Sequence, residues 1–384
     1  MREARHMKKV YWRPQSTPFI AFVLVALFSI AGLLAVEHFR TEDRRPHYQK
    51  RLQASRLALE AMEVIKNERI RRGDPIDKET DPVGSGLIGA FVTSVTSEPG
   101  SLQAKQTSIN PNLAAVIVDL LDRAKVREGD SVAVSFSGSF PALNIAVLAA
   151  LKTLNLKPTI ISSVSGSQWG ANAPDFLWVD MERLLQAQGL FPFRSAAASL
   201  GGRRDRAREL TEKGREQLLL AVERNGLPLL EAETIRHNID ERMAIYFKAD
   251  PPKAYINVGG GRVSAGPRPF KVLIKPGLLP AQLSTDIRGD SVIRRFLKER
   301  IPIIQLWNIR ILANEYGLPI APTSMPAVGE GEVYYRTGYN RWLAGSILVA
   351  IIGALYLFSR SDWGFRILQA SSRPEEIGPP EPMV

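Results

Sequence analysis

The clearest alternation of hydrophobic and polar positions lies between residues 129 and 175. An apolar run ends there in the small-residue turn Ser137-Gly138-Ser139, and apolar residues at helical spacing follow it. A second apolar run, residues 158–164, ends in another small polar loop. This order predicts a strand, a helix and a second strand parallel to the first. Ligands bind at the carboxyl ends of strands in open parallel sheets, so we place the functional site at these two loops.

The remaining pattern extends this unit into a larger domain. It predicts further strands at 87–95, 191–199, 254–258 and 301–306, and helices at 46–72, 113–125, 174–188, 212–225, 232–248 and 308–316. Four of the apolar strands end at a small or amide residue, namely Ser137, Ser165, Gly259 and Asn308. We therefore expect an α/β fold with a parallel sheet in three layers and one composite pocket at the strand ends.

Two long apolar segments flank this domain. Residues 17–36 carry no charge, and residues 342–358 form a second such run. Both lengths are typical of transmembrane helices, with a cleaved signal peptide and a buried core helix as the respective alternatives. We expect a two-pass protein of the cytoplasmic membrane, with a basic cytoplasmic N-terminus (1–16), a juxtamembrane helix (37–72), an extracytoplasmic α/β domain (73–340) and a disordered Pro- and Glu-rich tail (359–384).

Composition limits the chemistry. The net charge of +11 and the pI of about 9.8 favour an acidic partner such as an anionic lipid or a polyanion. The absence of cysteine excludes disulfides, thiolate catalysis and cysteine-ligated metals. Only His237 of the four histidines lies within the globular part, which argues against a Ser-His-Asp triad and a histidine-ligated metal. No nucleotide or metal motif is present, so no cofactor and no metal is predicted.

The candidate site combines small polar residues, amides and glycines that can hold a carboxylate or phosphate. The predicted ligand-binding residues are Thr107, Ser108, Asn110, Ser137, Gly138, Ser139, Ser165, Ser167, Trp169, Asn172, Asn257, Gly259, Gly260, Gly261 and Asn308. Ser108 and Asn110 have the alternative role of capping the helix at 113–125.

Two further features each have more than one interpretation. A nucleophilic mechanism would use Ser137 or Ser139, with Lys105 or Asp175 as the base, but we expect binding without chemistry. The basic loop at 200–215 is either a solvated surface or a polyanion contact. In the second case the contact residues are Arg203, Arg204, Arg206 and Arg208.

Several long blocks together resemble the poly-γ-glutamate system protein family, which is encoded with the machinery for capsule-type poly-γ-glutamate synthesis. These blocks are GSLQAKQTSINPN, VAVSFSGSFPALNIAVLAAL, PTIISSVSGSQWGANAPDFLWVDMERLL, FPFRSAAASLGG, AYINVGGG and NIRILANEYGLPI. The resemblance implies a membrane component that helps to make, export or anchor an anionic polymer. Its implied partners are poly-γ-glutamate and other synthase subunits, with no nucleic acid. It supplies no catalytic residues.

Two alternatives to a binding or guiding subunit stay open. One is an envelope hydrolase or transferase that acts on the polymer through a serine. The other is a sugar-phosphate-binding protein, because residues 130–139 also resemble the serine-rich turn of phosphosugar-binding domains.

Overall fold

The computed structural model describes residues 19–267, 274–281 and 289–360. The chain separates into a compact unit, Arg44–Arg336, and a second unit formed by the segments on either side of it. The two units are described separately.

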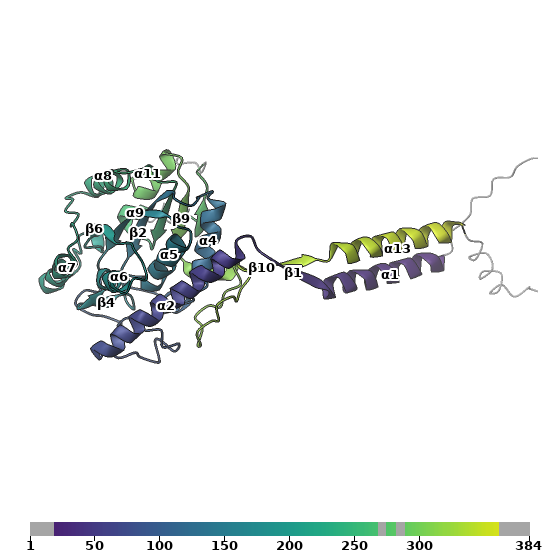
Figure 1. Ribbon diagram of the computed structural model, residues 1–384, viewed down its shortest axis with the longest axis horizontal. Helices are drawn as coiled ribbons and strands as arrows, with labels where there is room; N and C mark the ends of the chain where they lie inside the picture. The colour runs from purple at the N-terminus through teal and green to yellow at the C-terminus, as the bar shows by residue number, and fades with distance from the viewer. Residues whose placement is uncertain (1–18, 268–273, 282–288, 361–384) are drawn as a thin grey trace, which may run out of the picture. The chain divides into compact units, whose positions relative to one another are not determined.

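A six-stranded sheet forms the centre of the larger unit (Figure 1). Its order is β6-β3-β2-β7-β9-β8, and every neighbouring pair is parallel except the antiparallel pair β8 and β9. The strands are β2 (Ser131–Ser137), β3 (Lys157–Ser163), β6 (Ser195–Ser199), β7 (Ala254–Val258), β8 (Gly277–Leu279) and β9 (Ile303–Leu306). The chain first builds outward from β2 through β3 to β6, then returns to the other side of β2 with β7. The strand order therefore reverses between β2 and β7, which is where open α/β sheets bind ligands.

Helices cover both faces of this sheet, because the strands alternate apolar side chains between two cores. Val132, Val134 and Phe136 of β2 face the larger core, and Ala133 faces the smaller one. The larger core is covered by α2 (Tyr48–Arg72), α4 (Leu113–Arg123), α5 (Pro141–Thr153), α6 (Trp178–Ala187), α7 (Glu212–Arg224) and α12 (Ile309–Glu315). The smaller core is covered by α8 (Ile235–Tyr246), α9 (Arg262–Ala265) and α11 (Val292–Lys298). The predicted three-layer α/β architecture is confirmed.

Helix α2 belongs to the larger unit as a packing element. Its alanine-rich stripe is fully buried and contacts α4 and α5. Arg51 on the same helix is 2% exposed and donates to Asp119 of α4 at 2.7 Å, while Tyr316 donates to the other oxygen of that carboxylate at 2.7 Å. A buried guanidinium needs such a partner, because an unpaired charge in the core is costly. This pair fixes α2 against the domain.

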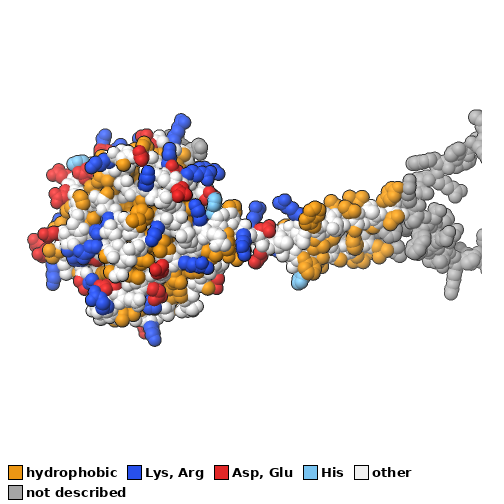
Figure 2. All heavy atoms as spheres, in the orientation of Figure 1, with side chains coloured by type: hydrophobic (Ala, Val, Ile, Leu, Met, Phe, Trp, Pro, Cys, Tyr) orange, Lys and Arg blue, Asp and Glu red, His pale blue; other side chains and the backbone are white. Residues whose placement is uncertain are grey.

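The smaller unit consists of two apolar helices that pack together, α1 (Phe19–His38) and α13 (Arg341–Arg360). Strands β1 (Arg40–Arg44) and β10 (Tyr335–Tyr339) pair into a short ribbon. Figure 2 shows hydrophobic side chains over both helices, and Leu33, Leu34 and Val349 are each more than 60% exposed. Within the described part of the chain, no helix combines the length and hydropathy that a membrane crossing requires. The predicted segment 1–16 and all but the first two residues of the predicted tail 359–384 lie outside the described residues, and residues 359 and 360 belong to α13.

Several predicted elements differ from those observed. Residues 87–95 form no strand. The side chain of Asn172 accepts a hydrogen bond from Ala90 N and donates one to Ala90 O, which fixes the segment as an ordered loop. The helix expected from residue 174 begins at Trp178, since Asn172–Ala173 and Phe176–Leu177 first pair as β4 and β5. The strands predicted at 191–199 and 301–306 are real but shorter. A short helix, α3 (Leu102–Ser108), was not predicted.

Candidate functional site

A cavity of about 840 Å³ opens at the carboxyl ends of β2, β3, β6 and β7. The loops that follow these four strands line it, together with α3, α9 and the start of α8. It therefore lies across the reversal point between β2 and β7. This cavity corresponds to the composite pocket expected at the strand ends.

The turn after β2 is built by close backbone contacts. A side chain at Gly138 would place its Cβ 2.8 Å from two backbone carbonyl oxygens of the loop after β3, so only glycine fits there. Ser137 Oγ accepts a hydrogen bond from Ser139 N at 3.2 Å, and Ser139 Oγ accepts one from Ser167 N at 3.0 Å. These bonds hold the loops after β2 and β3 together as one wall of the cavity.

Lys105 of α3 extends into this wall and is 3% exposed. Its Nζ donates to Ser167 Oγ at 2.9 Å and to the carbonyl oxygen of Ser139, and it lies 3.7 Å from the centre of the Phe140 ring. Burial removes water from the ammonium group and lowers the pKa of Lys105 to about 7. No described carboxylate forms an ion pair with it, so the cavity wall holds a lysine without a counter-charge.

The loops after β6 and β7 complete the lining, next to Ser165 in the loop after β3. Ser165 is 3% exposed, and its Oγ has no hydrogen-bond partner among the described residues. Gly201 approaches it so closely that a Cβ would lie 2.5 Å from that hydroxyl oxygen. Gly259 has a φ of +90° after β7, a conformation that glycine adopts without strain. The unpaired serine hydroxyl beside the glycine loops after β6 and β7 leaves a hydrogen-bonding group that a ligand can satisfy.

A buried ion pair supports the loop after β6. Arg242 of α8 is 1% exposed and donates to Asp205 at 2.7 Å and to Ser199 Oγ at 2.7 Å. Asp205 and its neighbour Arg204 both have positive φ, 62° and 56°, which costs energy for residues with a side chain. The ion pair offsets this strain and fixes the loop at the cavity.

The charged side chains on the cavity wall carry both signs, and the excess of positive charge favours anions. Besides Lys105, the exposed arginines Arg203, Arg204 and Arg262 line it. The acidic lining residues are Glu98, Asp205 and Glu233, of which Asp205 is neutralised by Arg242.

Of the predicted residues, the structure brings one group together at this cavity. These are Lys105, Ser137, Ser139, Ser165, Ser167, Gly259, Gly260, Gly261, Arg203 and Arg204. Gly138 is not a lining residue, but its lack of a side chain allows the turn after β2 to pack against the loop after β3. Asn257 is buried below the glycine loop, where its amide donates to the Gly259 carbonyl at 2.9 Å.

Other predicted residues lie outside the cavity and have structural roles. Thr107 Oγ1 donates to Gln103 O at 2.7 Å, and Ser108 Oγ donates to Lys105 O at 2.7 Å. Asn110 accepts from Asn112 N in the turn before α4, and the N-cap residue of α4 is Asn112 without a side-chain cap hydrogen bond, so the alternative capping role is not observed. The residues that also lie outside are Asn308, Arg206 and Arg208.

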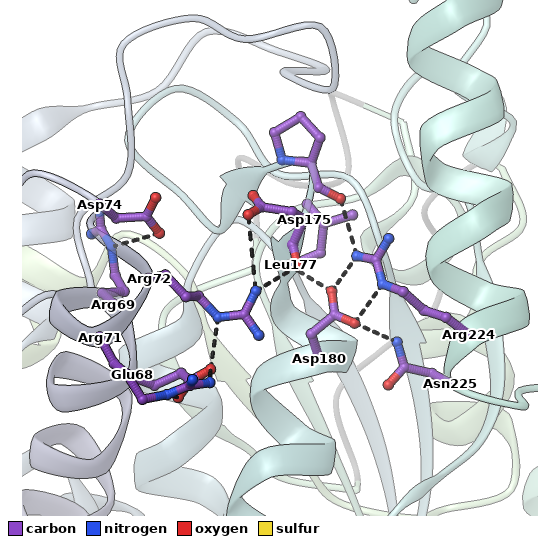
Figure 3. A network of polar contacts seen from close by, with 11 residues as sticks. Glu68, Arg69, Arg71, Arg72, Asp74, Asp175, Leu177, Asp180, Arg224 and Asn225 are labelled. Atoms are coloured by element: carbon purple, nitrogen blue, oxygen red, sulfur yellow. Dashed lines mark hydrogen bonds and ion pairs between the residues drawn. The ribbon is translucent and has the colours of Figure 1, made fainter.

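Trp169, Asn172 and Asp175 line a second cavity of about 500 Å³ beside α2. Asp175 is 68% exposed there and pairs with Arg72 at 3.9 Å (Figure 3). Asp180 nearby accepts from Leu177 N at 2.8 Å and also binds Arg224. The structure therefore does not bring Asp175 to Ser137 or Ser139, and it leaves Lys105 as the candidate base at the first cavity.

Sequence reasoning missed several lining residues, chiefly Ser163, Gly201, Gly202, Arg262 and Ser264. The pair Gly201-Gly202 follows an apolar strand in the same way as Gly259 does, so the same signal was available. Among the described residues, no group of three or more histidine, aspartate and glutamate side chains is arranged to hold a metal ion. Comparisons with models of protein families, with characterised proteins and with solved structures find no match for this chain.

Proposed function

We propose that the larger unit binds an anionic ligand in the cavity at the strand ends, and that this ligand is poly-γ-glutamate. The observation that supports the proposal most strongly is Lys105, a buried lysine on the cavity wall with which no carboxylate of the described residues pairs. Buried ammonium groups are normally paired, because removing them from water is costly. A bound carboxylate would supply the missing counter-charge and raise the pKa of Lys105 again.

The rest of the cavity suits a ligand with repeated carboxylates. Arg203, Arg204 and Arg262 add positive charge along its wall, and Ser165 offers a hydroxyl that has no partner in the described structure. Guanidinium groups bind carboxylates in a bidentate manner. These features support a polyanion in general, and the resemblance to the poly-γ-glutamate system proteins selects γ-linked glutamate from that class.

We place the protein at the cytoplasmic membrane, with its larger unit on the outer side. The exposed apolar side chains of the paired helices α1 and α13 support membrane attachment, since such surfaces are unusual in contact with water. In this position the unit would guide the polymer beside the other synthase subunits. The test is cell fractionation: recovery with the membrane pellet and release by detergent are expected, and recovery in the soluble fraction of a detergent-free lysate would contradict it.

The binding proposal is tested with the full-length protein in mild detergent and a short γ-glutamate oligomer. Calorimetry should detect binding that weakens as salt is raised, with the oligomer left intact. The double variant Arg203→Ala/Arg204→Ala removes two lining charges and should weaken binding about tenfold or more. Arg208→Ala is the matched control, because Arg208 lies in the same loop but not at the cavity.

The outcomes separate the alternatives. Equal loss of affinity in the control and the double variant would show that only the net charge of the loop matters and would contradict a specific cavity site. Tighter binding of a sugar phosphate than of the oligomer would favour the sugar-phosphate-binding alternative over poly-γ-glutamate.

A further inference from the structure

Lys105 and Ser167 form a hydrogen bond, and other contacts hold each of the two residues in place. Lys105 Nζ is fixed by its hydrogen bonds to Ser167 Oγ and to the Ser139 carbonyl, and by the Phe140 ring. The backbone of Ser167 is fixed by its N–H, which donates to Ser139 Oγ at 3.0 Å. An amine and a hydroxyl 2.9 Å apart on a cavity wall have the spacing of a general base and its nucleophile.

We infer that Ser167 is a nucleophile and Lys105 its general base, and that the cavity carries out acyl transfer on an ester or amide carbonyl. The pair itself does not depend on which ligand the cavity binds.

The geometry selects Ser167 over the two serines expected from the sequence. Ser137 Oγ contacts the backbone of Ser139, and Ser139 Oγ contacts the backbone of Ser167. Lys105 reaches Ser139 only through its carbonyl oxygen. Because Ser139 Oγ already accepts a hydrogen bond, its own hydrogen is free to donate to the oxygen of a reacting carbonyl.

The reaction balances without a cofactor. Neutral Lys105 takes the proton from Ser167 Oγ as that oxygen bonds to the carbonyl carbon. The bond to the leaving alcohol or amine then breaks, and the leaving group takes the proton from Lys105. Water, or a second amine, next adds to the acyl carbon and gives its proton to Lys105, and the proton returns to Ser167 as the Oγ–carbon bond breaks.

Base catalysis requires an uncharged lysine near neutral pH. Desolvation provides this, since it brings the pKa of Lys105 to about 7. The charged side chains that line the same cavity are Glu98, Asp205, Glu233, Arg203, Arg204 and Arg262. A carboxylate held by the arginines leaves Lys105 uncharged, whereas one that binds directly at Lys105 protonates it and blocks the reaction.

The first test uses the full-length protein and p-nitrophenyl acetate. A burst of about one p-nitrophenolate per chain is expected, with peptide mapping that places the acetyl group on Ser167 and a burst rate that rises with pH to a plateau above 7. Ser167→Ala should abolish the burst, and Ser94→Ala, which removes an exposed serine hydroxyl outside the cavity, should retain it. An acetyl group on Lys105, or an undiminished burst in Ser167→Ala, would overturn the inference.

A second test does not require turnover. The chain has no cysteine, so Ser167→Cys introduces a single thiol, and Ser163→Cys places the matched control in the same cavity beside Ser199 instead of the lysine. Alkylation by iodoacetamide should give Ser167→Cys a thiol pKa below the ordinary value of about 8.5. Adding Lys105→Met should slow alkylation at pH 7 by about tenfold. Equal pKa values for the two thiols would refute the pair, whatever the outcome of the polymer-binding experiment.

Discussion

Burial of Lys105 makes the stability of this protein depend on pH in a defined direction. In the unfolded chain the pKa of this amine returns to 10.5, whereas burial holds it at about 7 in the folded protein. Between these values the unfolded state binds one more proton than the folded state. The free energy of unfolding therefore rises as pH increases through this window, which is the opposite of what a lysine stabilised by an ion pair would give.

The size of this effect follows from the two pKa values. From pH 7.5 to pH 9.5, linkage predicts that Lys105 alone raises the free energy of unfolding by about 2.5 kcal/mol. Lys105→Met removes the titrating amine and retains much of the side-chain volume. The variant should therefore lack this increment, while other groups contribute equally to both proteins.

The assay is urea denaturation of the full-length protein and of Lys105→Met at the two pH values, followed by circular dichroism. Lys213→Met is the matched control, because Lys213 is exposed on α7 and water solvates its amine in both states. It should keep the wild-type change with pH. If wild type and Lys105→Met gain equally between pH 7.5 and 9.5, Lys105 is not a desolvated amine, and the counter-charge argument for the ligand fails with it.

Three further predictions follow from the same cavity. Carboxylate binding should recharge Lys105, so calorimetry at pH 8 in buffers of different ionisation enthalpy should detect uptake of up to about one proton in wild type and none in Lys105→Met. Arg242→Met leaves Asp205 buried without its partner and should lower the free energy of unfolding by about 3–5 kcal/mol in urea denaturation; a loss under about 1 kcal/mol would show that the loop needs no such support. Gly138→Ala, whose Cβ meets two carbonyl oxygens at 2.8 Å, should lower the free energy of unfolding by about 1–3 kcal/mol. Gly261→Ala places its Cβ within 4 Å of no atom of the described residues and should have the melting temperature of wild type; equal melting temperatures for the two variants would contradict this.

The strands and the packing helices were predictable because their signal is local. Strand β7 has the bounds expected for residues 254–258, and α4 and α7 begin where their sequences predict. Errors occur where a long-range contact decides the conformation. Residues 87–95 are apolar enough for a strand, but Asn172 takes the hydrogen bonds of Ala90 and prevents pairing with the sheet. No pattern within the segment itself carries that information.

The site shows a second limit, which is set by strand order. Gly259 and Asn308 carried the same signal, a small or amide residue after an apolar strand. The structure places β7 next to β2, at the reversal point, and β9 one strand further out. Gly259 therefore lines the cavity and Asn308 begins α12 outside it. In the same way Lys105 reaches the cavity only because the unpredicted helix α3 presents it there. A strand-end motif thus identifies candidate site residues, and the order of the strands in the sheet determines which of these residues line the same cavity.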